Sequence, residues 1–76
     1  MAATPVPSLA VHVRANGEEV TLADGATVLD LLTHLGLGAA WVLVERNGAP
    51  VDRARLATTV LVEGDRLELV RAVAGG

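Results

Sequence analysis

The stretch that decides the fold reads DGATVLDLLTHLGL, over residues 24–37. Thr27 has the side chain of a helix N-cap, and Asp30 follows three residues later in the manner of a capping box. The apolar side chains then recur at helical spacing, at Val28, Leu31, Leu32 and Leu35. Gly36 is suited to the position just past a helix. Together these features predict a helix over residues 28–35.

The segment before this helix predicts a β-hairpin. Residues 9–15 alternate between apolar and polar side chains, which is the period of a strand with one buried face. Asn16-Gly17 is a strong signal for a tight hairpin turn, because both residues tolerate positive φ. The alternation resumes over residues 18–22. The side chains expected on the core face are Leu9, Val11, Val13, Val20 and Leu22.

The segment after the helix predicts a second hairpin and a final strand. Residues 41–46 are mostly apolar, and Asn47-Gly48 repeats the hairpin signal. Pro50 lacks an amide donor, so residues 49–51 form at most a short edge segment. The remaining segments are a loop or helical turn (52–57), a stretch with room for a short strand (58–62), a turn at Gly64-Asp65 and a last strand (66–73).

The order of elements is therefore two strands, a helix, a strand, a connection and a further strand. This order favours an α+β, β-grasp fold, with a mixed sheet of four to five strands and one main helix packed on one face. The crossover through the helix lets the first and last strands run parallel as central neighbours. We expect a flexible N-terminal tail over residues 1–8, the folded domain over residues 9–73 and a flexible C-terminal tail over residues 74–76.

Composition and charge exclude several classes of protein. With 76 residues, of which 51% are hydrophobic, the chain has room for one small domain and none for a second. Its six arginines are scattered among nine carboxylates, without the basic stripe that nucleic-acid binding needs. The longest apolar run, residues 39–44, is far shorter than the ~20 residues of a membrane span, and no secretory pattern opens the chain. We therefore expect a cytoplasmic domain that binds neither nucleic acid nor membrane.

No constellation of side chains in the sequence indicates catalysis or metal binding. His12 and His34 stand alone and are expected on the surface, and the carboxylates form no obvious dyad. The chain has no cysteine, hence no thiolate nucleophile and no cysteine-based zinc site. Trp41, its single aromatic residue, is expected to be a core or edge side chain, with a binding anchor as the alternative. Together with the short chain, these features favour a binding module, a carrier or a subunit, with no metal site.

The end of the sequence, Ala74-Gly75-Gly76, is the feature with chemical meaning. Residues without Cβ can thread a narrow channel in a partner enzyme, and the terminal carbonyl is open to attack. A carboxylate is a poor electrophile, so an enzyme must first activate it with ATP as an acyl-adenylate. A sulfur or nitrogen nucleophile can then displace AMP. Residues 71–76, fully extended, reach up to about 20 Å, which suits a tail that enters another protein.

At this point the sequence resembles a known family, the ubiquitin-like β-grasp sulfur carriers, and within it the ThiS family of thiamin biosynthesis. The resemblance covers residues 9–76 and depends on five short motifs in the family's order and spacing. They are Asn16-Gly17-Glu18, Asp24-Gly25-Ala26-Thr27-Val28 leading into residues 29–32, Val44-Glu45-Arg46-Asn47-Gly48, GDRLELV (64–70) and RAVAGG (71–76). The extension over residues 1–8 and Ala74, where many relatives have glycine, depart from the family pattern.

The resemblance implies a specific chemistry at Gly76. An E1-like adenylyltransferase (ThiF-like) would adenylate its carboxylate with MgATP. Sulfur from a cysteine persulfide donor would then convert the acyl-adenylate to a thiocarboxylate, and thiazole synthase (ThiG-like) would take that sulfur to build the thiazole of thiamin. The protein would be a carrier and co-substrate with no bound cofactor, and Gly75 and Ala74 would thread the partner's active site.

Three other functions stay open at this point. The molybdopterin-synthase small subunit shares the fold and the Gly-Gly end, and would carry sulfur in another pathway. A ubiquitin-like modifier would join the same carboxylate to a lysine of a substrate protein. A β-grasp interaction domain would carry the two glycines incidentally and would tolerate loss of the tail.

A small carrier is also expected to present an apolar surface to its partners. Leu69 and Val70 are adjacent, so one of them points away from the core in a regular strand. We hypothesise that Val60, Val62 and Val70 lie on the sheet face away from the helix and form a partner-binding surface together with Val73. The alternative is that these valines are ordinary core residues.

Overall fold

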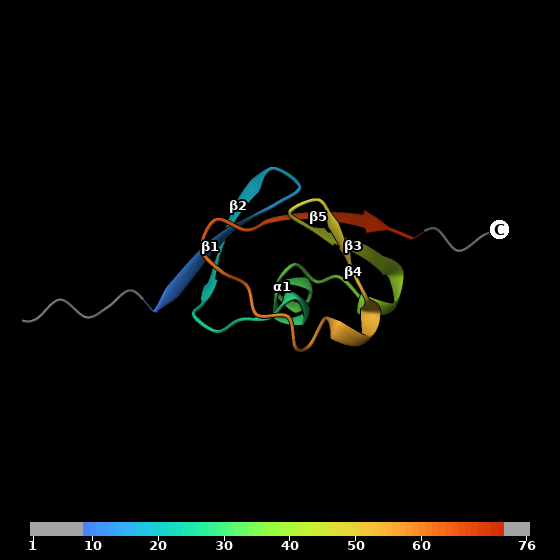
Figure 1. The fold of residues 1–76 in the computed structure, drawn as a ribbon, viewed down its shortest axis with the longest axis horizontal. Helices are drawn as coiled ribbons and strands as arrows, with labels where there is room; N and C mark the ends of the chain where they lie inside the picture. Colours follow the sequence, from blue (N-terminus) through green and yellow to red (C-terminus); the bar gives the residue numbers. More distant parts are fainter. Residues whose placement is uncertain (1–8, 73–76) are drawn as a thin grey trace, which may run out of the picture.

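The computed structural model describes residues 9–72 and shows a mixed five-stranded sheet with one α-helix packed on it (Figure 1). The elements are β1 (Ala10–Ala15), β2 (Glu18–Ala23), α1 (Val28–His34), the 3₁₀ turn η1 (Ala39–Trp41), β3 (Val42–Arg46), β4 (Ala49–Val51), the 3₁₀ turn η2 (Arg53–Arg55) and β5 (Arg66–Arg71). The strand order is β2-β1-β5-β3-β4, with β1 and β5 parallel and the other neighbours antiparallel. The predicted β-grasp fold is confirmed, including its parallel central strands.

Both predicted Asn-Gly turns are present, and both use the left-handed conformation. The φ angle is 51° at Asn16 and 83° at Gly17, and it is 51° at Asn47 and 88° at Gly48. Two consecutive positive φ angles are those of a type I′ turn, whose twist matches that of the strands it joins. The tight turns fix the register of both hairpins, so the apolar residues of each strand stay on one face.

α1 begins at the predicted residue and ends one residue earlier than predicted, at His34, with Leu35 as its C-cap. The Thr27 hydroxyl accepts a hydrogen bond from the Asp30 backbone N–H at 3.2 Å, and the Asp30 carboxylate accepts one from the Thr27 N–H at 2.8 Å, which completes a capping box. Past the last turn, Gly36 has a φ of 72°, and the Leu37 N–H donates to the Leu32 carbonyl at 2.8 Å. This Schellman ending limits α1 to seven residues.

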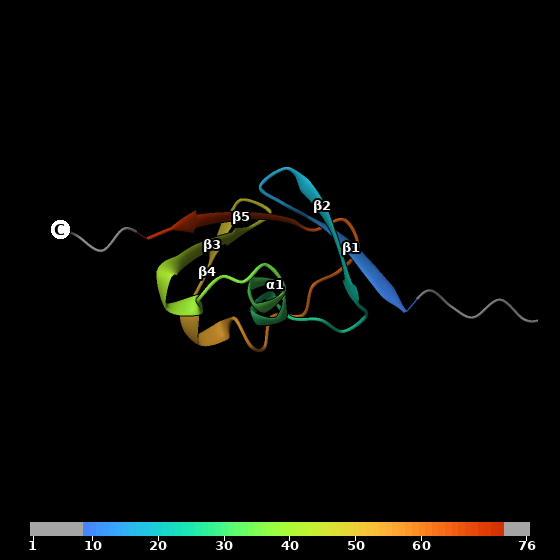
Figure 2. The ribbon, with the colours of Figure 1, turned by 180° about the vertical axis from the view of Figure 1, so that it is seen from behind.

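The core lies between α1 and the sheet. Its most enclosed side chains, each at most 1% exposed, are Val13, Val28, Leu31, Leu32 and Leu67. In both ribbon views, α1 lies on one side of the sheet and no described helix lies on the other (Figures 1 and 2). The sheet therefore has one buried face and one open face, and alternate residues of each strand belong to one or the other.

Some apolar residues at the ends of predicted elements are exposed. Leu9 is 69% exposed because it precedes β1, and Leu35 is 38% exposed as the C-cap residue of α1. β3 starts one residue later than predicted. Trp41 ends η1 instead of opening the strand, and it is 58% exposed. Trp41 is therefore not a core residue, and of the predicted placements an edge residue or a binding anchor remains.

The chain between β4 and β5 is irregular. The predicted loop or helical turn over residues 52–57 contains η2. Residues 58–62 form no strand, although the sequence leaves room for one. Within the described part of the chain, their β-type pairing is a single bridge between Val60 and Thr27. No helix within residues 9–72 is long and apolar enough to cross a membrane.

The two predicted tails, residues 1–8 and 74–76, lie outside the described residues, as does Val73.

Candidate functional site

β5 leads to the C-terminal residues, and it is fixed from the β1 side, as far as Leu69, by Asn16. The regular pairing of β1 with β5 ends at Ala15 and Leu67. Beyond it, the Asn16 side-chain amide donates to the Leu69 carbonyl at 3.0 Å, and its Oδ1 accepts from the Leu69 N–H at 2.8 Å. The Asn16 side chain thus takes the place of a further strand residue beside β5.

The other Asn-Gly turn fixes β5 from the β3 side. The Asn47 Oδ1 accepts from the Arg66 N–H at 2.9 Å, and the Asn47 N–H donates to the Arg66 carbonyl at 2.8 Å. The Asn47 Nδ2 also donates to Asp65 Oδ1 at 2.9 Å. Each turn asparagine therefore has two roles, in its own turn and against the backbone of β5 or the residue just before it.

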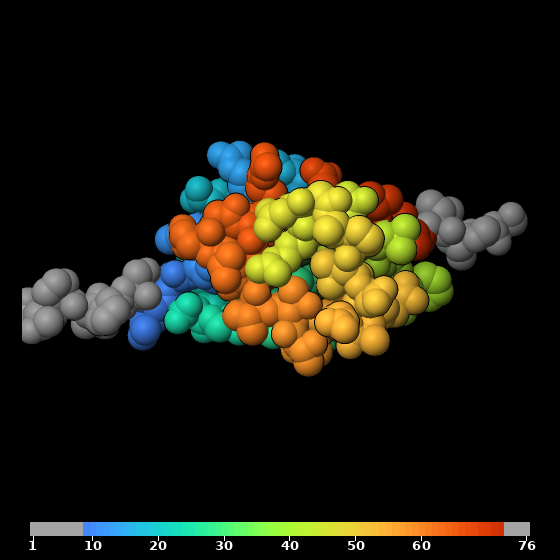
Figure 3. All heavy atoms as spheres, viewed as in Figure 1, coloured from blue at the N-terminus to red at the C-terminus, as the bar shows by residue number. Residues whose placement is uncertain are grey.

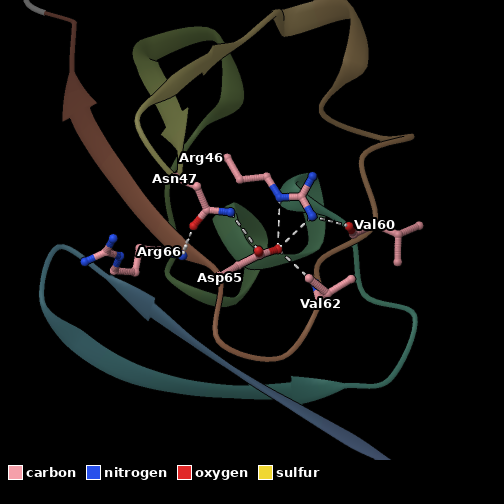
Figure 4. A network of polar contacts seen from close by, with 6 residues as sticks. All are labelled: Arg46, Asn47, Val60, Val62, Asp65 and Arg66. Atoms are coloured by element: carbon pink, nitrogen blue, oxygen red, sulfur yellow. Dashed lines mark hydrogen bonds and ion pairs between the residues drawn. The ribbon is translucent and has the colours of Figure 1, made fainter.

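Asp65, directly before β5, is the centre of a buried polar network (Figure 4). Its side chain is 4% exposed, and it accepts from Arg46 Nε and from the Val62 N–H, both at 2.9 Å. Arg46 also donates to the Val60 carbonyl at 3.3 Å. A buried carboxylate is tolerated only when its oxygens are satisfied. The network therefore ties the loop before β5 to the end of β3.

The pKa of Asp65 reflects two opposing effects. Burial raises it, because the charged form loses water. The hydrogen bonds from the Val62 N–H, Asn47 and Arg46, with the charge of Arg46, outweigh burial and hold the pKa of Asp65 below its usual value. Asp65 is therefore a structural anion in the folded chain.

The end of β5 has no comparable side-chain anchor. Val70 and Arg71 are exposed, and Arg71 forms no ion pair with any residue in the 9–72 range. The backbone is still held, because Arg71 pairs with Val42 and the Ala72 N–H donates to the Trp41 carbonyl at 2.7 Å. Figure 1 shows β1 beginning and β5 ending at opposite ends of the molecule. Ala72, the last described residue, thus lies at the end of the molecule opposite to Leu9.

The open face of the sheet carries a small apolar area near this end. Leu43 and Val70 are direct cross-strand partners and are 59% and 58% exposed. Glu45 and Glu68 are exposed partners on the same face, one side-chain row away. Like charges directly opposite each other destabilise a sheet, so this pair does not serve the fold. The area suits a partner with apolar groups beside basic ones.

The structure corrects the expected placement of two of the predicted partner-binding valines. Val70 lies on the open face, as hypothesised. Val60 and Val62 are 50% and 53% exposed, but they belong to the segment between η2 and β5 and not to the sheet. Val60 bridges to Thr27 at the start of α1, and Val62 binds the residue before β5, whereas Val70 lies near its end.

Leu43 is the exposed partner of Val70 that the sequence analysis missed. The available signal was the period of the strand predicted over residues 41–46, which puts Leu43 on the face opposite to Val42 and Val44, although all three are apolar. The remaining predicted site residues, Val73, Ala74, Gly75 and Gly76, lie outside the described residues, and their roles stay predictions.

The two histidines are surface residues, as the sequence predicts. His12 Nδ1 lies 3.0 Å from Glu63 Oε2, with side chains 43% and 66% exposed. The His12 backbone N–H donates to Glu63, which lowers the pKa of Glu63 from its usual value. His34 is exposed in the last turn of α1. In the described range, no three histidine, aspartate or glutamate side chains gather in a way that could hold a metal ion.

Comparison with known proteins relates the whole fold to one family. The sequence model of the ThiS family matches residues 10–76. The crystal structure of the thiamine biosynthesis protein (ThiS) from Geobacter metallireducens matches with a TM-score of 0.69 and 33% identity, over 87% of this chain and 100% of that one. A computationally designed protein based on human erythrocytic ubiquitin matches with a TM-score of 0.52 and 18% identity, over 88% and 95% of the two chains. At that identity the second likeness concerns the fold alone.

Two curated relatives are much longer proteins. Thiazole synthase from Magnetococcus marinus is 39% identical over 66 residues, which cover 87% of this chain and 20% of that protein. Thiazole synthase from Paramagnetospirillum magneticum is 39% identical over 61 residues, which cover 80% of this chain and 19% of that protein. The chain thus spans about one fifth of the length of these relatives.

Proposed function

The chain belongs to the ThiS family, and from this premise we propose that it is a sulfur carrier of thiamin biosynthesis whose Gly76 carboxylate is adenylated and converted to a thiocarboxylate. The observation that carries the proposal is that the family match runs through Ala74-Gly75 to Gly76. The fold supports it, because β5 is held by hydrogen bonds from Asn47 and Asn16 and ends in exposed residues only a few positions before Gly76 in the sequence.

The reaction begins with a carboxylate oxygen of Gly76. It attacks the α-phosphorus of MgATP on an E1-like, ThiF-like enzyme, and pyrophosphate leaves. The terminal sulfur of a cysteine persulfide then attacks the acyl carbon, and AMP leaves with the bonding electrons. A thiol cleaves the resulting acyl disulfide, which yields the thiocarboxylate and a new disulfide. The 76 residues contain no cysteine, so the persulfide and the thiol both come from partners.

The acceptor in this proposal is a ThiG-like thiazole synthase. Support comes from the two relatives named thiazole synthase, each of which contains a segment 39% identical to this chain. The chain itself supplies no catalytic group and holds no cofactor in this scheme, since MgATP is bound by the activating enzyme. Its part is to present Gly76 as a co-substrate to two enzymes in turn.

We place the partner-binding surface on the open face, around Leu43 and Val70. Both side chains are more than half exposed, and they lie close to the point where Ala72 leaves the sheet. Val73 would continue this surface into the tail. Val60 and Val62 are equally exposed on a separate segment, so they serve as matched control positions.

The test is the intact mass of the chain after incubation with the E1-like enzyme of its own organism, MgATP and a cysteine persulfide donor. The expected result is exchange of one oxygen for sulfur, mapped to Gly76 by fragmentation. The exchange requires ATP, and the sulfur disappears when thiazole synthase and its other substrates are added. A chain that lacks Gly76 and keeps its melting temperature is the matched control and is expected to gain no sulfur.

Two outcomes would contradict the proposal. One is a folded, complete chain that gains no sulfur under these conditions. The other concerns the protein isolated from its own cells. In that protein, Gly76 would be followed by further residues and would carry no free carboxylate.

A further inference from the structure

A cleft of about 300 Å³ lies beside the end of β5 and is not used by the proposed chemistry. Its walls are Gly36, Leu37 and Gly38 after α1, Trp41 and Val42 at the start of β3, and Arg71 and Ala72 at the end of β5. The volume is at the lower limit for small-molecule sites. It therefore suits one or two side chains of another protein better than a cofactor.

The cleft exists because α1 is shorter than the strands it covers. Seven helical residues span about 10 Å, whereas six strand residues span about 20 Å. Leu67 and Leu69 face α1 and are buried, and Arg71 continues the same alternation on the next row. At that row the helix has already ended, so Arg71 lines an open cleft instead of the core.

Trp41 forms the apolar wall of this cleft. It is 58% exposed, and a Cβ added at Gly38 would lie 3.2 Å from its Cδ1. Gly38 has a φ of −76°, which any residue can adopt. The absence of a side chain at Gly38 therefore makes room for the indole and serves no turn of the backbone.

The charge of the cleft is opposite to that of the chain. The net charge is −3, yet Arg71 is the one charged residue among those that line the cleft. Arg71 makes no ion pair with any described residue, so its guanidinium is available for a carboxylate. An exposed tryptophan beside an available arginine is the combination most enriched among residues that dominate protein interfaces.

The position of the cleft indicates which protein reaches it. Only residues 73–76 separate Ala72 from the Gly76 carboxylate, and four extended residues span about 14 Å at most. An enzyme that encloses Gly76 must therefore contact the surface around Ala72. Ala72 itself lines the cleft and is held against Trp41 by the hydrogen bond to its carbonyl. Figures 1 and 2 show the end of β5 and η1 at the same end of the molecule.

We propose that the cleft between Trp41 and Arg71 anchors the enzyme that adenylates Gly76, by receiving an apolar side chain of that enzyme next to a carboxylate. This inference rests on the proposed function, since it assumes that such an enzyme acts on Gly76. It adds a second contact, on the helix side of β5, to the one around Val70 on the open face.

Steady-state kinetics of ATP-dependent adenylation test the anchor. Trp41→Ala is expected to raise KM for the carrier about 30-fold with kcat unchanged, because it removes binding that is equal in the ground and transition states. Arg71→Glu is expected to raise KM about tenfold or more, with an effect that shrinks at high salt. Gly38→Ala, which crowds the indole, is expected to raise KM a few-fold.

Two variants away from the cleft are controls. Arg14→Glu makes the same charge change near the start of β5, and Val62→Ala shortens an exposed apolar side chain. Both are expected to keep KM within about twofold of the unmodified chain.

A direct measurement of binding separates this proposal from the proposed function. Trp41 is the single tryptophan, so 5-fluorotryptophan gives the chain one ¹⁹F resonance. That resonance is expected to shift when the enzyme is added without ATP. If the resonance shifts but no adenylation follows when ATP is added, the proposed function is overturned, while the contact between the enzyme and the cleft still stands.

Three results would overturn the anchor. The first is normal adenylation with an unchanged KM in Trp41→Ala. The second is a resonance that shifts on deletion of residues 73–76 in the absence of enzyme, which would make the chain's own tail the occupant. The third is a resonance that shifts with the concentration of the chain alone, which would make a second copy the occupant.

Discussion

The two ends of β5 differ in burial and in the side chains that hold them. At its start, Asp65 is 4% exposed and binds Arg46, Asn47 and the Val62 N–H, and Asn47 also holds the Arg66 backbone. From the other side, Asn16 holds the backbone at Leu69. At its end, Val70 is 58% exposed, and the next residue, Arg71, lines the cleft. The side-chain hydrogen bonds that fix β5 thus end at Leu69, and the exposed side chains beyond it are left for contact with partners in the proposed function.

The largest effect on folding is expected at Asp65. Asp65→Ala leaves Arg46 without its buried partner and should lower the free energy of unfolding by about 3 kcal/mol. That is a large share of the total, which for a chain of this size is about 4–11 kcal/mol. Urea denaturation followed by circular dichroism measures it. A loss below about 1 kcal/mol would mean that the network does not fix the start of β5.

The same carboxylate gives the protein an acid-sensitive stability. Because the pKa of Asp65 is lower in the folded than in the unfolded chain, the unfolded chain binds more protons in acid. The stabilisation is complete above the unfolded pKa of about 4 and is lost as pH falls through the lower, folded value. Glu63 contributes in the same direction. Urea midpoints from about pH 2 to about pH 6 should show this loss, with a flatter profile in Asp65→Asn.

The clamp at Asn16 is expected to have a smaller effect. Asn16→Gly keeps a residue that accepts a φ of 51° but removes both hydrogen bonds to the buried Leu69 backbone. We expect a loss of about 2 kcal/mol in unfolding free energy. Asn16→Asp keeps the acceptor and should lose less. Equal losses in the two variants would show that the turn, and not the clamp, requires asparagine.

The clamp at Asn47 should matter less again, because one of its two side-chain hydrogen bonds satisfies the exposed Arg66 N–H and the other ends on Asp65, which keeps its bonds from Arg46 and the Val62 N–H. Asn47→Gly is expected to lower the free energy of unfolding by about 1 kcal/mol in the same denaturation experiment. A larger loss than at Asn16 would reverse the order that burial predicts.

The smallest effect on folding is expected at the other end of the strand. Val70→Glu should change the free energy of unfolding by no more than about 0.5 kcal/mol, because the side chain is exposed. It should nevertheless raise KM for adenylation, since it places a charge in the apolar area. Val62→Glu, at similar exposure, is the control. If Val62→Glu impairs adenylation as strongly, the partner also contacts the segment before β5.

Much of the fold follows from local signals in the sequence. The capping box at Thr27, the Schellman glycine at Gly36 and the two Asn-Gly turns each depend on residues within a few positions of one another. The alternation in β1 and β2 identifies their buried faces for the same reason. These features could be predicted because neighbouring residues decide them.

The features that were missed depend on residues far apart in the chain. Asn16 and Leu69 are 53 positions apart, and Arg46 and Asp65 are 19 apart, so no local pattern marks either contact. Trp41 follows small residues and precedes an apolar strand, which favours burial. It is exposed because it ends η1, outside the sheet and beyond the end of α1, and this placement depends on how the layers assemble.

The most direct test of the account is the mass of the C-terminal peptide in protein isolated from its own cells grown without thiamin. The account predicts a peptide that ends at Gly76, with a fraction of the molecules carrying sulfur in place of one carboxylate oxygen. That fraction should rise in cells that lack thiazole synthase. A peptide that always carries the plain carboxylate, or that continues past Gly76, would contradict the claim that the free end of β5 delivers a sulfur-carrying terminus.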